Sequence, residues 1–140
     1  MNHKKPSFIF VFRDGVSDSQ LRVVKEFEVP QFKECFHNLP DYNPKLVVIV
    51  VQKRINQRIF AKTGPSPSQL DNPAPGTVVD HTVTRREWED FFLISQHVRQ
   101  GTVSPTHYVT VDDTSNLKID QIQQITYRMT HMYYLSLIHI

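Results

Sequence analysis

Two apolar runs and the helical pattern between them predict an α/β fold. Residues 8–12 (Phe-Ile-Phe-Val-Phe) and 46–51 (Leu-Val-Val-Ile-Val-Val) are continuously apolar, and the second run is rich in β-branched residues. Such runs are typical of strands that are buried on both faces of a sheet. Strands joined through helices form a crossover unit, which we expect to be parallel and right-handed.

Helices are predicted between these two strands. Ser17 and Gln20 have the spacing of a capping box, which marks the start of a helix. We expect the helix to be interrupted and restarted at Val29-Pro30, because proline is favoured in a first helical turn. The spacing of the apolar residues predicts an inner face made of Leu21, Val24, Phe27, Phe32, Cys35, Phe36 and Leu39.

The second half of the chain predicts more strands and a closing helix. Residues 62–76 hold four of the nine prolines and two of the four glycines, which indicates a surface loop. β-Branched and aromatic residues predict strands at 55–61, 77–84, 88–95 and 106–111. A helix is expected from Leu117, with an inner face made of Ile122, Ile125, Met129 and Met132.

Composition describes an ordinary single domain. The chain has 140 residues, 39% hydrophobic and 21% charged, and its net charge of +2 indicates no particular partner. No apolar stretch is long enough to cross a bilayer, and the basic start lacks the apolar core of a signal peptide. One cysteine, Cys35, excludes an internal disulfide. We therefore expect a cytoplasmic or nuclear protein with no membrane partner.

Asp14 is the first candidate functional residue, because it follows directly on the strand at residues 8–12. The carboxyl ends of strands are where the chemistry of open α/β sheets gathers, and Asp oxygens suit Mg²⁺. Asp14 is thus a candidate catalytic or metal-binding acid. The alternative is that it caps the following turn or pairs with Arg13.

A basic segment is the second candidate. Residues 42–70 contain no Asp or Glu, and they include Lys53, Arg54 and Arg58. In an extended strand, Arg54, Asn56 and Arg58 would share one face. Such a row can contact phosphates without reading sequence, or it can be a solvated edge that discourages pairing with another strand.

Two further positions leave alternatives open. Asp112-Asp113 follows a predicted strand and could join Asp14 at a metal, or it could serve the turn and helix cap ahead. His107 lies inside a predicted strand, where a hydrogen-bonded core or edge histidine is the alternative to a functional one. The histidines have no zinc-ligand spacing, and the sequence has no glycine-rich phosphate loop.

Several ordered motifs resemble the second half of a PIWI domain, the ribonuclease-H-like domain of Argonaute and Piwi proteins. The matching segments are residues 13–17 (Arg-Asp-Gly-Val-Ser) with Gln20, 47–54, 75–80, 101–108 and 124–127. Residues 28–31 (Glu-Val-Pro-Gln) and 103–108 resemble the Piwi branch. The resemblance runs from about Ser7 to Tyr134 and implies a ribonuclease-H-like mixed sheet with flanking helices, incomplete in this chain.

The resemblance implies a piRNA-type gene-silencing protein that pairs a small guide RNA with a target RNA. Active members cut the target with two Mg²⁺ ions, and Asp14 matches one of their acidic ligands. Lys53, Arg54 and Arg58 match the basic segment beside the guide, and His107 matches a histidine of the guide channel. Silencing-complex proteins are further implied partners. The alternative is a non-catalytic RNA-binding or protein-interaction module.

The resemblance also predicts what this chain lacks. The first catalytic Asp and the Glu would lie before Met1, and the last ligand, His or Asp, beyond Ile140. Residues 1–134 are thus expected to form part of a PIWI domain that is inactive alone, although the complete protein could be a Mg²⁺-dependent endonuclease. Residues 135–140 depart from the family and resemble a translated library adaptor, so His139 is not taken as the missing ligand.

Overall fold

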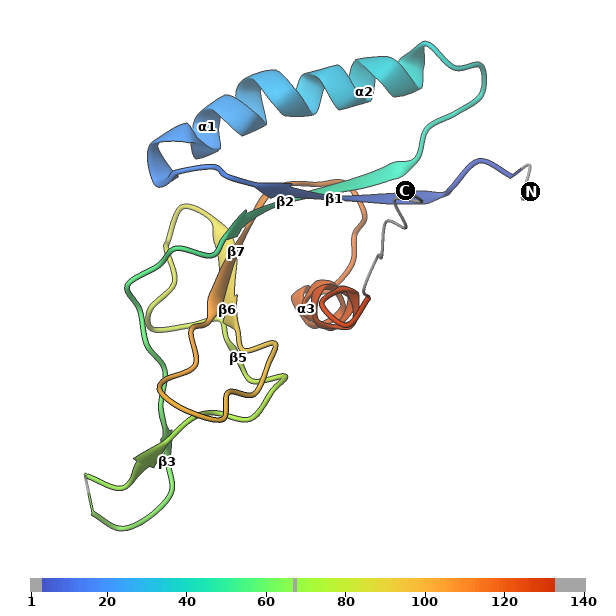
Figure 1. Ribbon diagram of the computed structural model, residues 1–140. Coiled ribbons are helices and arrows are strands. Elements are labelled where there is room, and N and C mark those ends of the chain that lie inside the picture. Colours follow the sequence, from blue (N-terminus) through green and yellow to red (C-terminus); the bar gives the residue numbers. More distant parts are fainter. Residues whose placement is uncertain (1–3, 67, 133–140) are drawn as a thin grey trace, which may run out of the picture.

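The computed structural model describes residues 4–66 and 68–132, and the expectation for residues 135–140 lies outside them. A five-stranded sheet has the order β1-β2-β7-β6-β5. Its strands are β1 (Phe8–Asp14), β2 (Lys45–Gln52), β5 (Val78–Val79), β6 (Glu89–Leu93) and β7 (Thr106–Asp113). β1 and β2 are parallel and the other pairs antiparallel, so the sheet is mixed. One helical layer covers β1 and β2, and helix α3 (Ile119–Met129) covers the opposite face (Figure 1).

The core is organised by β2. It is hydrogen-bonded to β1 on one side and β7 on the other, and its residues 46–51 are all buried. Leu46, Val48 and Val50 pack with the first helical layer, whereas Val47 and Ile49 belong to the cluster that contains Ile122 of α3. This alternation follows from the two-residue period of a strand. The predicted central strand is confirmed.

β1 is less buried than we expected. The prediction placed residues 8–12 in a strand covered on both faces, but these residues are half-buried, apart from Phe8, which is 47% exposed. In the described part of the chain, β1 has β2 as its one neighbouring strand. At this edge of the sheet, no strand of the described residues covers the outer side of β1, so its apolar residues are only half-buried. The parallel crossover from β1 through helices to β2 is confirmed.

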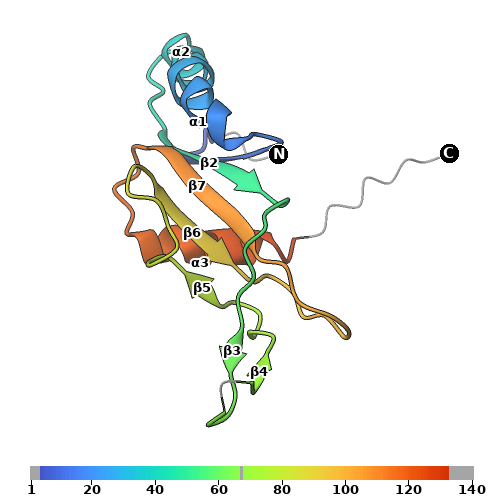
Figure 2. The same cartoon turned by 90° about the vertical axis from the view of Figure 1, so that its left-hand side faces the viewer.

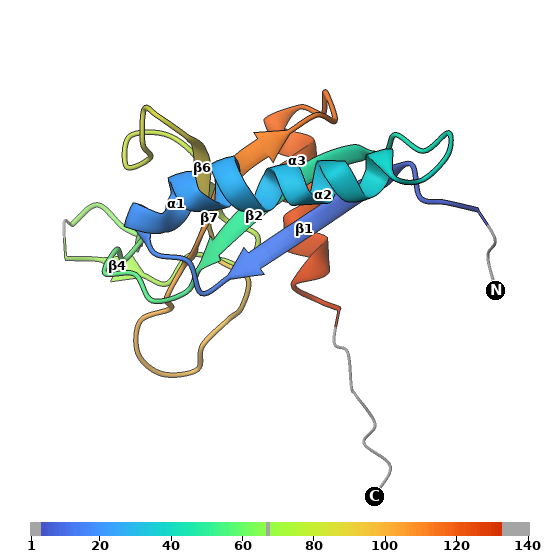
Figure 3. The same ribbon diagram turned by 90° about the horizontal axis from the view of Figure 1, so that it is seen from above.

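The helical layer is continuous where a break was predicted (Figure 3). It consists of η1 (Asp18–Gln20), α1 (Leu21–Val23), the π-helical turn η2 (Val24–Glu28) and α2 (Val29–His37). In η2, the N–H of Val29 donates to the carbonyl of Val24, five residues earlier. This wider turn comes just before Pro30, whose missing N–H and bulky ring an ordinary α-helical turn accommodates poorly.

The extra residue in the π-turn changes which side chains face the sheet. Val24 and Val29 are both buried at 2% exposure, whereas Phe27 is 62% exposed. Phe32 and Phe36 pack against the same core, but Cys35 is exposed. The predicted inner face was therefore wrong at Phe27 and Cys35, and also at Leu39, which lies beyond the end of α2 and is 45% exposed. A regular 3.6-residue period does not continue across the π-turn.

The basic segment does not form the strand predicted at residues 55–61. Strand pairing resumes only in the short hairpin β3 (Ala61–Lys62) and β4 (Leu70–Asp71), which projects away from the sheet (Figure 2). β1 ends at Asp14, opposite Val51, and β7 begins beside Gln52. Both neighbours of β2 thus stop at this level, and the chain beyond Gln52 has no partner there. The strand predicted at 77–84 is likewise reduced to the two residues of β5.

The strands at 88–95 and 106–111 are confirmed as β6 and β7. Helix α3 is also present, but its face is rotated from the expected one: Ile122, Gln123 and Thr126 are buried, whereas Met129 is 44% and Met132 60% exposed. Gln123 is not among the residues predicted for the inner face. It is buried because its amide donates to the carboxylate of Asp80, at 2.9 Å.

The π-turn makes a testable prediction about core register. We expect Val29→Ala to destabilise the chain by about 2 kcal/mol, because it removes a buried branched side chain. Phe27→Ala, two residues earlier, should change stability by less than about 0.5 kcal/mol, because its ring is mostly in solvent. Urea unfolding measures both. A larger loss for Phe27→Ala would contradict the register.

Candidate functional site: a basic cleft at the end of the central strands

A cleft of 1020 Å³ lies where β1 and β2 end and β7 begins. Four predicted site residues line it: Asp14, Lys53, Arg54 and His107. The fifth, Arg58, is outside the lining. The parallel pairing of β1 and β2 brings their carboxyl ends together, and the antiparallel β7 adds its first residues there. The topology thus gathers side chains from residues 14 to 107 at one end of the sheet.

Asp14 carries the carboxylate that the sequence singled out. Its Oδ2 is 2.6 Å from Nζ of Lys53, and its Oδ1 accepts a hydrogen bond of 2.8 Å from the N–H of Gly15. The hydrogen bond from Lys53, followed by that from Gly15, lowers the pKa of Asp14 below its usual value of 3.8. The side chain is 56% exposed, so the carboxylate is ionised and accessible to a cation.

The turn after Asp14 depends on Gly15. Its φ of +76° lies in the left-handed region, where a side chain would be strained. The guanidinium of Arg13 pairs with the carboxylate of Glu28 of η2 at 2.9 Å and donates to the backbone carbonyl of Asp14 at 2.6 Å, so it does not pair with the carboxylate of Asp14. The alternative that Asp14 pairs with Arg13 is therefore not what the structure shows; Lys53 is the partner. The hydrogen bond that the Asp14 carboxylate accepts from the N–H of Gly15 does fit the turn-capping alternative.

Lys53 and Arg54 directly follow β2 and place two positive charges at the cleft. Both side chains are exposed, as is Arg58, although no strand fixes their alternation. Nη1 of Arg58 donates to the backbone carbonyls of Ile55 and Gln57, at 3.0 and 2.7 Å. Lys53 and Arg54 can therefore meet a ligand within the cleft, whereas Arg58 lies beyond its lining.

His107 borders the cleft but is 3% exposed. Its Nδ1 lies 2.8 Å from Oε1 of Gln52, its Nε2 2.6 Å from Oδ2 of Asp90, and its ring stacks on Phe92 with centroids 4.3 Å apart. Both ring nitrogens thus have protein partners. This geometry fits the alternative interpretation of His107 as a hydrogen-bonded core histidine. A direct contact between His107 and RNA stays a prediction.

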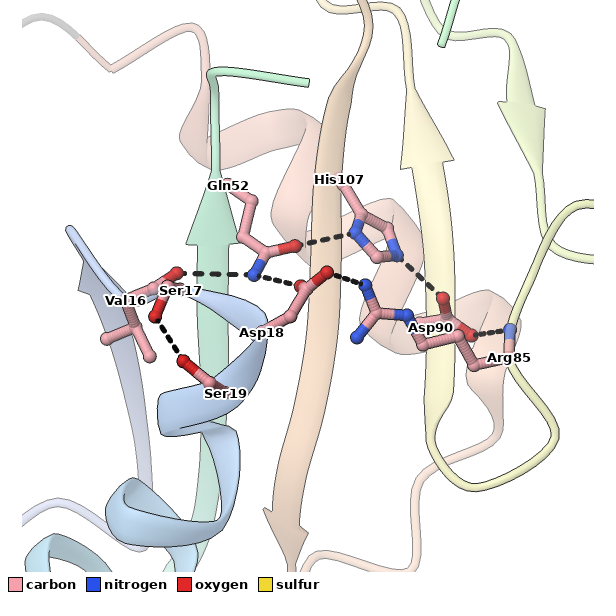
Figure 4. A network of polar contacts seen from close by, with 8 residues as sticks. All are labelled: Val16, Ser17, Asp18, Ser19, Gln52, Arg85, Asp90 and His107. Atoms are coloured by element: carbon pink, nitrogen blue, oxygen red, sulfur yellow. Dashed lines mark hydrogen bonds and ion pairs between the residues drawn. The ribbon is translucent and has the colours of Figure 1, made fainter. Parts of the chain in front are cut away.

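Sequence reasoning did not identify Asp18, Gln52, Arg85 and Asp90 as site residues. Figure 4 shows them joined with His107 in one polar network across the cleft. The hydrogen bond from Arg85, the largest effect, lowers the pKa of Asp18. A polar residue that closes an apolar run, such as Gln52 after residues 46–51, was the available signal.

Asp112 and Asp113 lie at the opposite end of the sheet from Asp14. β7 is antiparallel to β2, so these residues pair with Val48 and Val47, whereas Asp14 pairs with Val51. Both belong to β7 rather than following it. The carboxylate of Asp113 accepts hydrogen bonds from the N–H and Oγ of Ser115, as the turn alternative predicts. The idea that they join Asp14 at a metal was wrong.

The described residues do not make a complete metal centre. No group of three or more His, Cys, Asp or Glu side chains with metal-binding geometry occurs within residues 4–66 and 68–132. Two carboxylates line the cleft: Asp18 is held by Gln52 and Arg85, and Asp14 has one oxygen paired with Lys53. The residues present thus fit one ligand of a divalent ion, and no reaction step can be built from them.

Comparison with solved structures defines the class of this domain. The chain superposes on Drosophila Piwi with a TM-score of 0.79 and 39% identity, over 94% of this chain and 18% of that one. It also matches the Kluyveromyces polysporus Argonaute with a guide RNA, with a TM-score of 0.76 and 31% identity, over 89% of this chain and 16% of that one. The ribonuclease-H-like mixed sheet with flanking helices, as part of a larger domain, is confirmed.

Sequence comparison shows the family. The Piwi domain model matches residues 1–140, so the chain belongs to the Piwi domain family. It is 54% identical to Piwi-like protein Ago3 of Bombyx mori and 55% identical to Piwi-like protein 1 of Gallus gallus, in each case over 134 residues. These matches cover 95% of this chain, which spans 14 to 15% of the length of those relatives. No helix among the described residues could cross a membrane.

The ion pair at Asp14 predicts a measurable change in its pKa. We expect Lys53→Met to raise the pKa of Asp14 toward 3.8, because the largest stabilisation of the carboxylate is lost. The matched variant Arg54→Met should leave it nearly unchanged. At pH values above 3.8 the pair contributes a small stabilisation to the fold. This contribution disappears as the pH falls through the lowered pKa of Asp14. Carboxyl ¹³C shifts report the titration; equal pKa values in wild type and Lys53→Met would contradict the pair.

Proposed function

We propose that this chain is part of a small-RNA-guided silencing protein of the piRNA type, and that its cleft binds the backbone of guide or target RNA. One observation carries the proposal: Lys53 and Arg54 continue directly from β2 into the cleft that Asp14 also lines. The similarity to an Argonaute with a guide RNA supports it. The chain would act in the cytoplasm or nucleus, with silencing-complex proteins as partners.

The proposed RNA contacts are electrostatic. Exposed Lys and Arg side chains bind phosphate oxygens and fix the path of a strand, while sequence is left to base pairing between guide and target. Asp14 and Asp18 are negative, but Lys53 and Arg85 pair with them. Arg54 and Arg58 have no carboxylate partner among the described residues, so their charge is available to phosphates.

We further propose that Asp14 supplies one oxygen ligand to Mg²⁺ in the complete domain. Bound there, the metal would supply the Lewis acidity and activated water that phosphodiester cleavage needs. This chain's own contribution is to hold an ionised carboxylate on a rigid turn at the strand end. The pairing of Asp14 with Lys53, and the lack of a ligand cluster in the described residues, favour RNA binding without cutting by this chain.

RNA binding can be tested through its salt dependence. We expect the double variant Arg54→Ala/Arg58→Ala to bind labelled single-stranded RNA more weakly than wild type. The slope of log K against log salt should fall by roughly 0.7 for each lost phosphate contact. Arg99→Ala/Arg128→Ala removes two exposed arginines outside the cleft and serves as the control. An affinity insensitive to salt and to the Arg54/Arg58 change would overturn the proposal.

Catalysis makes a separate prediction. The isolated chain should not cleave RNA in the presence of Mg²⁺, because one carboxylate cannot organise two metal ions. A cleavage assay with a labelled target, with Asp14→Ala in parallel, measures this. Specific cleavage by the wild type that disappears in Asp14→Ala would show that the chain is a nuclease by itself.

A further inference from the structure

Five residues at the cleft form a closed ring of polar contacts (Figure 4). Asp18 accepts from the Gln52 amide at 2.8 Å and pairs with the guanidinium of Arg85. Oε1 of Gln52 lies 2.8 Å from Nδ1 of His107, and Nε2 of His107 lies 2.6 Å from Oδ2 of Asp90. The backbone N–H of Arg85 closes the ring by donating to Oδ1 of Asp90, at 3.0 Å.

The positions of donors and acceptors around the ring follow from the Gln52 amide. Its Nε2 faces two acceptors, the carboxylate of Asp18 and the carbonyl of Val16, at 2.8 and 3.2 Å. A nitrogen with two hydrogens satisfies both, whereas an oxygen there would repel both. Oε1 must therefore point at His107, and Nδ1 of His107 must donate to it. The amide of Gln52 is thus oriented by its neighbours on both sides.

The second ring nitrogen of His107 requires another proton. Nε2 faces a carboxylate, so a hydrogen must lie between Nε2 and Oδ2 of Asp90. The side chains of His107 and Asp90 are 4% and 1% exposed, so neither charge could remain uncompensated there. Phe92, stacked on the imidazole, closes its other side. Asp90 therefore keeps His107 as a donor toward Gln52.

We propose that Gln52 is a positioning residue of the cleft, and that His107 and Asp90 fix its amide so that it clamps residues 16–18 onto the end of β2. These residues follow the turn that carries Asp14 and line the cleft together with Lys53 and Arg54. His107 then acts on the cleft through Gln52. The effect on RNA rests on the proposed function, whereas the direction of the ring rests on geometry alone.

A donor–acceptor swap tests the clamp. Gln52→Glu has nearly the same shape and still accepts from His107, but it places two carboxylates against each other at Asp18. We expect amide exchange at residues 15–20 to accelerate at least about tenfold, as for loss of one charge-assisted hydrogen bond. RNA affinity should fall with it. Adding Asp18→Asn supplies an amide that donates to Glu and still accepts from Arg85. The double variant should therefore recover both properties in part, because the carboxylate of Glu still faces the carbonyl of Val16.

Charge alone needs its own control. Gln57→Glu adds the same charge at another position lining the cleft, outside the ring, and should lower RNA affinity without accelerating exchange at residues 15–20. The double variant Gln52→Glu/Asp18→Asn has the net charge of the wild type. Its recovery therefore measures hydrogen-bond direction. No recovery, or a Gln52→Glu phenotype equal to that of Gln57→Glu, would overturn the proposal.

The proton positions have a spectroscopic readout. In the wild type and in Gln52→Glu, ¹⁵N spectra of His107 should show a proton on Nδ1, with Nε2 hydrogen-bonded to Asp90. An unprotonated Nδ1 would overturn the direction of the ring. If amide exchange at residues 15–20 changes in these variants as expected but RNA affinity does not, the proposed role of Gln52 in RNA binding is overturned. The assigned hydrogen-bond directions in the ring would then still hold. If the chain binds no RNA, the proposed function fails, and exchange and ¹⁵N spectra still decide the ring.

Discussion

Burial of β2 on both faces and along both edges is the constraint on which the rest of the structure depends. Each alternate side chain of residues 46–51 must meet a different apolar layer, and this places helices on both sides of the sheet. Burying each such side chain contributes about 1.5–3 kcal/mol, so the register of β2 is strongly fixed. The same register decides where β2 stops, at Gln52, and so where the cleft begins.

The sequence specified this frame because the signal was local and strong. Continuous β-branched runs predict buried strands, and β2, β6 and β7 are where the pattern placed them. Whether a strand lies at the edge of a sheet depends on which other strands pair with it. The half-burial of β1 could therefore not be predicted from its five apolar residues. The π-turn before Pro30 was missed for a similar reason: the sequence marks a disturbance there, but whether the helix breaks or widens depends on the sheet beneath it.

The site was predicted in one part and missed in another. Asp14 was found because a carboxylate after a buried strand has a position that topology makes meaningful. Lys53 and Arg54 were found through charge, although their expected strand does not form. Asp90 carries no such signal, and Gln52 is marked only as the polar residue that closes an apolar run, because their contacts with His107 join residues that lie 17 and 55 positions apart in the chain.

Two kinds of polar contact occur at the cleft, one exposed and one buried. The pair of Asp14 and Lys53 is more than half exposed, so it is weak and can exchange partners with a cation or a phosphate. The contact of His107 with Asp90 is buried, and breaking it would leave an unpaired charge inside the protein. The exposed pair at Asp14 can rearrange when a ligand binds, whereas the buried contact of His107 with Asp90 and its hydrogen bond to Gln52 link the end of β2 to β7 and β6. The contacts that hold the cleft in shape thus reach from its lining, at Gln52 and His107, to the buried Asp90 behind it.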